Sequence, residues 1–229
     1  MARVIRLTEQ ELVGLLTGLA KMFVKKDDES DSETSDVSND TETEDGDDET
    51  STTLKPIGKV SAKGQELLNN PIFKKKLKEI SNAIHIDENS IIKLMKHESG
   101  LNPEIKNSLG CVGLIQFCPG GGMPKIINSK SYTLDEIRYD LEAQMDAIKE
   151  FWTKGYNNGK IKRPADLYLY NFFPIAAGKP DDFVLQAKGL SATAVAKANP
   201  GFNKKLGKPV SSPLTVGDLK TYYRQTGMV

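Results

Sequence analysis

The sequence is poor in the residues that build metal sites and disulfide frameworks. Its 229 residues include two cysteines, two histidines and one tryptophan. Two cysteines do not make a disulfide framework, and together with the two histidines they lack the spacing of zinc ligands. We therefore expect no metal and no other cofactor. Cys111 and Cys118 could form a local disulfide, but two reduced, half-buried thiols are the favoured prediction.

Long apolar runs are also absent. No run approaches the roughly 18 residues that a membrane-spanning helix requires. Residues 12–20 come closest to a signal peptide, but Glu9 and Glu11 precede them and no small-residue cleavage site is convincing. We therefore expect neither a membrane span nor a signal peptide.

Basic residues are missing from one segment of a chain whose net charge is zero. Residues 27–49 contain 13 acidic residues and no Lys or Arg, whereas residues 51–229 carry 26 basic against 16 acidic side chains. An acidic segment is therefore joined to a basic body. The basic body would suit nucleic acid, an acidic membrane surface or an anionic cell-wall polymer, or it is simply a solvated surface. No groove-reading motif supports nucleic acid.

The N-terminal residues 1–26 are typical of an amphipathic helix. Thr8 and Glu11 form a capping box, and the apolar stripe within residues 8–24 consists of Leu12, Leu15, Leu16, Leu19 and Phe23. Residues 27–54 have almost nothing to bury, so we expect a disordered acidic linker. The helix should dock on a protein partner, the favoured prediction, or pack back on the body at residues 55–229.

The body has mainly helical periodicity. Helices are expected at residues 72–84, at 88–98 between an Asp87 N-cap and Gly100, and at 135–154. Another should begin at Pro164. Loops are expected after Pro200, and then a last helix begun by a Thr215–Asp218 capping box. The fold class is α+β, predominantly α.

Glu98 is the candidate catalytic residue. Ile91, Leu94 and Met95 mark the buried stripe of helix 88–98, and Glu98 falls on the same face. Burial disfavours the charged form of a carboxyl group and raises its pKa, which suits a general acid. The alternative is that Glu98 points to solvent, as most charged residues do. His97 is adjacent but on another face, so we expect it at the surface or a groove rim and not as the base.

Two motifs weigh against a solvent-facing Glu98. Residues 98–103, "ESGLNP", and 110–117, "GCVGLIQF", resemble the first two motifs of the soluble lytic transglycosylase family in the lysozyme-like superfamily. A third family motif, Tyr-Asn-Ala-Gly, is similar to "YNFF" at residues 170–173, where the tyrosine and asparagine match and the small residues do not. The resemblance covers roughly residues 72–175 and implies a lysozyme-like domain.

The resemblance implies a chemistry that needs one carboxylate. In this family one Glu protonates the glycosidic oxygen between N-acetylmuramic acid and N-acetylglucosamine, then takes the proton from the C6 hydroxyl, which closes a 1,6-anhydro ring. A hydrolase would need a second carboxylate, for which Glu104, Asp135 and Glu136 are candidates. The implied catalytic residue is Glu98, and the implied substrate-binding residues are Ser99, Gln116, Phe117, Tyr170 and Asn171. We expect Tyr170 in the cleft and Phe172 and Phe173 in the core.

The opening of the sequence, "RVIRLTEQEL", bears a weak resemblance to phage virion proteins. It suggests a virion-associated enzyme that is delivered to the cell wall or periplasm, with peptidoglycan as its substrate and a virion or tail component as partner of helix 8–24. A lysozyme-type muramidase, or a virion structural protein with an inactive lysozyme-like fold, is the alternative.

Overall fold

The computed structural model describes residues 60–187 and 189–229. The predictions for the helix at residues 1–26 and the linker at 27–54 lie outside these residues. The described elements follow the order α2 (Ala62–Asn69), α3 (Pro71–Ile84), α4 (Glu88–Ser99), β1 (Ile126–Ile127), β2 (Lys130–Ser131), α5 (Leu134–Ile137), α6 (Leu141–Asn157), α7 (Pro164–Phe172), α8 (Ala192–Ala198), α9 (Pro200–Lys205) and α10 (Val216–Gln225).

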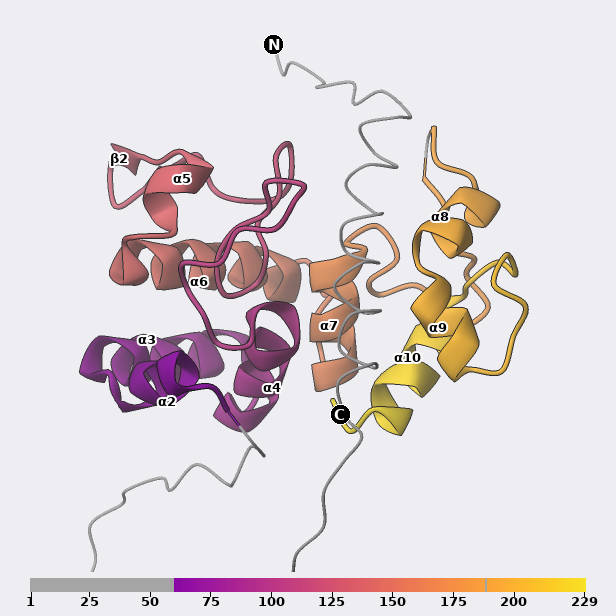
Figure 1. The fold of residues 1–229 in the computed structure, drawn as a ribbon, viewed down its shortest axis with the longest axis horizontal. Coiled ribbons are helices and arrows are strands. Elements are labelled where there is room, and N and C mark those ends of the chain that lie inside the picture. Colours follow the sequence, from indigo (N-terminus) through magenta and orange to yellow (C-terminus); the bar gives the residue numbers. More distant parts are fainter. Residues whose placement is uncertain (1–59, 188) are drawn as a thin grey trace, which may run out of the picture.

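The predominantly α, α+β fold class is confirmed. The one described sheet is a short antiparallel pair in which Ile126 faces Ser131 and Ile127 faces Lys130. Helices α2, α3, α4 and α6 lie to one side of α7, and α8, α9 and α10 to the other (Figure 1). Within the described part of the chain, no helix combines the length and apolarity needed to cross a membrane.

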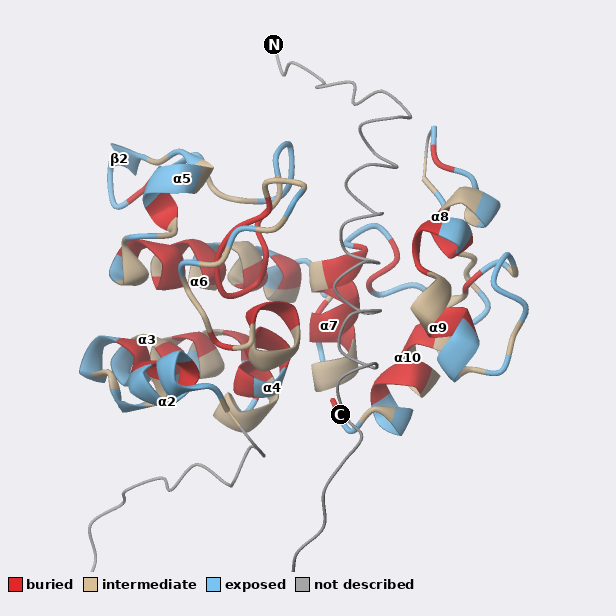
Figure 2. Cartoon of the chain, viewed as in Figure 1, coloured by how far each residue is buried: buried red, intermediate tan, exposed pale blue. Residues whose placement is uncertain are grey.

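The core lies where the helices face one another. The apolar faces of α3 and α6 are fully buried against each other, and in Figure 2 the buried stretches of the helices point inward. Lys76 of α3 also donates to Asp146 of α6 at 2.7 Å, next to this apolar contact. Helix α4 packs against α3, so the α3–α6 pair supports the position of α4 and of the loop that follows it.

Helix α4 begins and ends where the sequence indicates. The Asp87 side chain accepts the backbone N–H of Ser90 at 2.9 Å, as an N-cap does. Gly100 adopts the left-handed conformation with φ of 63° and donates its N–H to the Lys96 carbonyl. Because both ends are fixed by local chemistry, the last turn of α4 holds Glu98 in a defined place.

Two boundaries were predicted wrongly. Residues 135–154 are not one helix, because α5 ends at Ile137 and the Asp140 side chain caps a new helix by accepting the N–H of Ala143. The residues after Pro200 are not all loop, since Pro200 itself is the first residue of α9. Proline is favoured at that position because a first-turn residue needs no hydrogen-bonded N–H.

The capping box of α10 is confirmed and leads to a pH-dependent prediction. Asp218 accepts from Lys208 and from the Thr215 N–H, at 2.7 and 2.8 Å. Burial alone raises the pKa of Asp218, but these hydrogen bonds outweigh it and bring the pKa below the ordinary 3.8. A lowered pKa contributes stability that is fully present above pH 3.8 and is lost as pH falls through the folded-state value.

We expect Asp218→Asn to lower the free energy of unfolding by about 1 kcal/mol at pH 7. Urea unfolding at a series of pH values should show the difference from wild type shrinking below pH 4. Asp182→Asn, at an exposed carboxylate in the loop before α8, is the matched control and should change little. A deficit that stays constant down to pH 2 would show that the charge of Asp218 is not the cause.

Candidate active site

Glu98 lies at the buried end of α4. Its side chain is 6% exposed, and Ile91, Leu94 and Met95 on the same face are fully buried. The predicted position of the carboxyl at the core-facing side of the helix is therefore confirmed. Ser99, also buried, donates its hydroxyl to the Met95 carbonyl at 2.7 Å. That bond ties Ser99 to its own helix, so its contribution in the structure is to the end of α4.

The charge of Glu98 affects the pKa of two tyrosines, Tyr168 and Tyr223. Burial, and after it the negative charge of Glu98, raises the pKa of Tyr168 on α7 and of Tyr223 on α10 well above the ordinary value of 10.0. Their rings lie 5.1 Å apart. The hydroxyl of Tyr168 is buried and has no hydrogen-bond partner among the described residues. Both phenols thus remain protonated and able to donate a hydrogen bond.

Residues 111–118 form a tight loop, the glutamine hairpin. Val112 and Phe117 exchange two backbone hydrogen bonds of 2.9 Å. Gln116 has φ of 57°, an unusual conformation for a residue other than glycine. Its Nε2 donates to the Gly113 carbonyl at 2.8 Å, and its Oε1 is buried without a partner in the described part of the chain.

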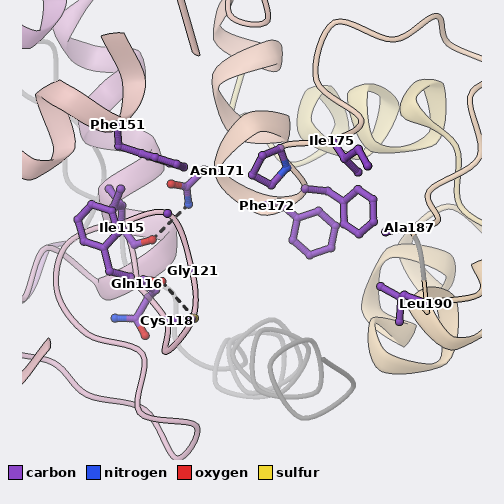
Figure 3. Close-up of a pocket in the computed structure, with 14 residues that line it drawn as sticks. Ile115, Gln116, Cys118, Gly121, Phe151, Asn171, Phe172, Ile175, Ala187 and Leu190 are labelled. Carbon is purple, nitrogen blue, oxygen red and sulfur yellow. Dashed lines mark hydrogen bonds between the residues drawn. The ribbon is translucent and has the colours of Figure 1, made fainter. Parts of the chain in front are cut away.

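Helix α7 connects the two halves of the site. Tyr168, near Glu98, and Asn171 are three residues apart and so lie on one face of the helix. Asn171 donates its Nδ2 to the Ile115 carbonyl at 3.3 Å, as Figure 3 shows, and thereby holds the glutamine hairpin. Tyr168, whose pKa is affected by Glu98, and Asn171, which contacts the glutamine hairpin, are therefore about one turn of α7 apart.

A cavity of about 380 Å³ opens beside the glutamine hairpin. Its walls come from the hairpin, from α6, from the end of α7 and from the loop before α8 (Figure 3). Most of its surface is apolar, with the rings of Phe151, Phe172 and Phe173, and its amide groups come from Gln116 and Asn171. Such a site suits a ligand with apolar faces and a few hydrogen-bonding groups.

The predicted site residues are only partly brought together. Gln116, Phe117 and Asn171 line the cavity, whereas Glu98, Ser99 and Tyr170 do not. Tyr170 is buried with its ring centroid 4.9 Å from that of Phe151. Phe172 and Phe173 are buried in the core, as expected, and also line the cavity. Successive residues of a helix point to different sides. The position of Tyr170 in the motif therefore did not tell whether its side chain faces the cavity or the core.

The other carboxylates considered for the site are engaged elsewhere. Glu104 is half exposed and pairs with Lys63. Asp135 accepts a hydrogen bond from Lys106 that lowers its pKa. Glu136 lies in the capping box of α5, where backbone and side-chain bonds from Thr133 lower its pKa. None of the three lines the cavity.

Two further features of the site were not predicted. Cys111 and Cys118 form a disulfide, so the expectation of reduced thiols was wrong. In the structure, the pairing of Val112 with Phe117 brings the two flanking cysteines together. Tyr223 lies more than a hundred residues from Glu98 in sequence, and no local pattern joins them. His97 is partly exposed, as expected.

Comparison with known proteins gives one match. The family model described as "Transglycosylase SLT domain" matches residues 76–137. The match includes Glu98 and the glutamine hairpin and ends before Tyr168 and Asn171. No curated protein and no solved structure matches the chain.

Proposed function

We propose that this protein, which carries a transglycosylase SLT domain at residues 76–137, cleaves peptidoglycan as a lytic transglycosylase. The bond cut is the β-1,4 linkage from N-acetylmuramic acid to N-acetylglucosamine, and Glu98 is the single acid/base. The domain match supports cleavage of peptidoglycan in general. The observation that carries the finer proposal is the buried carboxyl of Glu98 at the end of α4, whose charge raises the pKa of two buried tyrosines.

The proposed reaction has two proton transfers. Burial disfavours the charged form of Glu98, so the carboxyl can give its proton to the glycosidic oxygen as the bond breaks. The carboxylate then takes the proton of the muramic acid C6 hydroxyl, whose oxygen bonds to C1 and closes the 1,6-anhydro ring. Glu98 ends protonated as it began, and no water enters the products. Glu104 and Asp135 are each paired with a lysine, which supports a mechanism without a second carboxylate.

The cavity supports a sugar ligand of this kind. Pyranose rings have apolar faces that pack on aromatic rings, and Phe172 and Phe173 supply such rings. N-acetyl groups and hydroxyls need donors and acceptors, which the Gln116 and Asn171 amides provide. The buried, unpartnered Oε1 of Gln116 would accept a hydrogen bond from the substrate, which would offset the cost of its burial.

The hydroxyl of Tyr168 allows a prediction in which stability and activity move in opposite directions. We expect Tyr168→Phe to keep or raise the free energy of unfolding, by up to about 1 kcal/mol, because it removes a buried hydroxyl without a partner. Turnover of peptidoglycan should fall roughly tenfold because a phenol donor that interacts electrostatically with Glu98 is lost. Thermal unfolding and initial rates on the same samples measure both. Full activity in the variant would remove Tyr168 from the reaction.

The experiment that tests the proposed function is mass spectrometry of purified peptidoglycan digested by the full chain. Products ending in 1,6-anhydro-muramic acid support the transglycosylase. Reducing-end products would instead identify a lysozyme-type muramidase and require a second carboxylate. Absence of both products would favour a structural or adaptor role of an inactive lysozyme-like fold.

We also propose that the enzyme is virion-associated and delivered to the cell wall or periplasm. The excess of basic residues after residue 51 would hold the body on an anionic wall. Helix 8–24 would dock on a virion or tail component, and the acidic linker would cover the basic body until release. Deleting residues 27–53 should then increase wall binding and activity at low salt. Unchanged binding would refute the covering role of the linker.

A further inference from the structure

We propose that the Cys111–Cys118 pair is a redox-controlled positioning element. As a disulfide it holds the glutamine hairpin in the conformation that binds substrate, and as two thiols it lets the hairpin open. The inference rests on the proposed function, because it concerns the same cleft. Its structural basis is the place of the disulfide: the two cysteines are the residues at either end of the hairpin, immediately outside the Val112–Phe117 pair.

Apart from the disulfide, few bonds among the described residues join the second half of the hairpin, residues 115–118, to its first half. The first half, residues 111–114, is anchored outside the hairpin, because Val112 also pairs with Lys106 and Gly113 donates to the Ile105 carbonyl. The second half is joined to the first by the single Val112–Phe117 pair and by bonds from Gln116 to the Gly113 carbonyl. So short a pairing is marginal by itself in water. The conformation it must hold is an unfavourable one, since Gln116 has a positive φ. A covalent link across the ends removes the open conformations of the loop and so favours the closed one.

The hairpin presents groups that the substrate would meet. Gln116 and Phe117 line the cavity, and Cys118 itself is part of the wall. Among the described residues, the Gln116 amide is oriented only by the Gly113 carbonyl, which belongs to the same hairpin. The side-chain hydrogen bond from Asn171 of α7 to the Ile115 carbonyl of the hairpin is 3.3 Å long. If the loop opens, the position of Gln116 relative to the rest of the cavity is lost.

The disulfide is also accessible to exchange. Cys111 is fully buried, but Cys118 is partly exposed at the cavity wall. In the oxidising direction the Cys118 thiolate attacks a small-molecule or protein disulfide, and the Cys111 thiolate then displaces the bound thiol. The external disulfide is reduced to two thiolates. The two protons that the cysteine thiols lose are taken up by these thiolates or released to solvent. A dithiol reductant reverses both steps.

This chemistry would make activity depend on the compartment. In a reducing cytosol both cysteines are thiols and the hairpin is loose, whereas an oxidising exterior closes it. The lytic enzyme would thus be weak where it is synthesised and active where peptidoglycan lies.

The test compares the full chain before and after dithiothreitol. We expect reduction to lower kcat/KM on peptidoglycan by roughly 10- to 100-fold, the order by which a short covalent loop favours its closed form. The loss should lie mainly in KM, because the affected groups bind substrate. Removal of the reductant and oxidation with glutathione disulfide should restore the rate. Since Cys111 and Cys118 are the only cysteines in the sequence, the reductant has no other disulfide to act on.

The control variant is Cys111→Ala/Cys118→Ala. It should have the activity of the reduced protein and no response to dithiothreitol. Amide hydrogen exchange provides a readout independent of catalysis: exchange at Val112 and Phe117 should accelerate on reduction by a similar factor, while exchange in α3 and α6 stays unchanged. If reduction accelerated exchange in a protein with no lytic activity, the proposed function would be wrong, but the closing of the hairpin by the disulfide would still be supported. Full activity of the reduced protein, or unchanged exchange, would overturn the inference.

Discussion

Glu98→Gln should reduce the release of anhydro-muropeptides by about 1,000-fold or more. General acid–base catalysis typically contributes 10²- to 10⁴-fold, and in the proposed reaction the same carboxyl serves both proton transfers. Glutamine keeps the shape of the side chain but can neither give nor take the proton. Because Glu98 is buried at the end of a well-capped helix, a neutral side chain of equal size should fold normally.

Glu104→Gln is the matched control for this variant. Glu104 follows the same turn but is half exposed and pairs only with Lys63 at the surface among the described residues, so its loss should change activity less than twofold. Quantified digests of the three proteins at equal concentration give the comparison. If Glu104→Gln were as inactive as Glu98→Gln, a two-carboxylate hydrolase would replace the single-residue mechanism. Activity retained in Glu98→Gln would exclude Glu98 as the acid.

Gln144→Leu should have the largest effect on stability. The fully buried Gln144 amide joins three segments: its Oε1 accepts the Leu114 N–H at 2.8 Å, and its Nε2 donates to the carbonyls of Pro103 and Ile137. Leucine would leave these buried backbone groups without their partner, at about 1 kcal/mol or more each. We expect a loss of about 3 kcal/mol and a decrease in Tm of roughly 10 °C.

Lys154→Leu, at an exposed position of the same helix α6, controls for the added apolar side chain. It should stay within about 0.5 kcal/mol of wild type. Urea unfolding of the three proteins at pH 7 measures the difference. A Gln144→Leu variant within 1 kcal/mol of wild type would mean that water replaces the lost amide. The close approach of Gln144 also explains Gly113, where a Cβ would lie 2.8 Å from the Gln144 amide carbon.

Local chemistry made α4 predictable from the sequence. The N-cap at Asp87, the left-handed Gly100 and the buried face that includes Glu98 depend on residues within one helix, and each was confirmed. The family resemblance was confirmed for residues 76–137. The predicted catalytic role of Glu98 and the binding roles of Gln116 and Asn171 stay predictions.

Long-range contacts were not predictable in the same way. The break between α5 and α6 was missed because apolar periodicity continues across it, while the decisive residue, Asp140, is a cap that periodicity does not reveal. The burial of Tyr170 against Phe151, where it does not line the cavity, depends on how α7 is rotated against α6. That rotation is a property of packing, which a motif of four residues does not contain.

The Gln144 amide has a consequence for how the protein can be divided. Residues 76–137 match the family model, yet within that segment Leu114 and Pro103 are tied together by a side chain that lies beyond its end. A fragment that stops at residue 137 would also expose the apolar face of α3, which α6 covers. The smallest piece able to fold must therefore extend through α6. The unit that folds is larger than the segment that matches the family model.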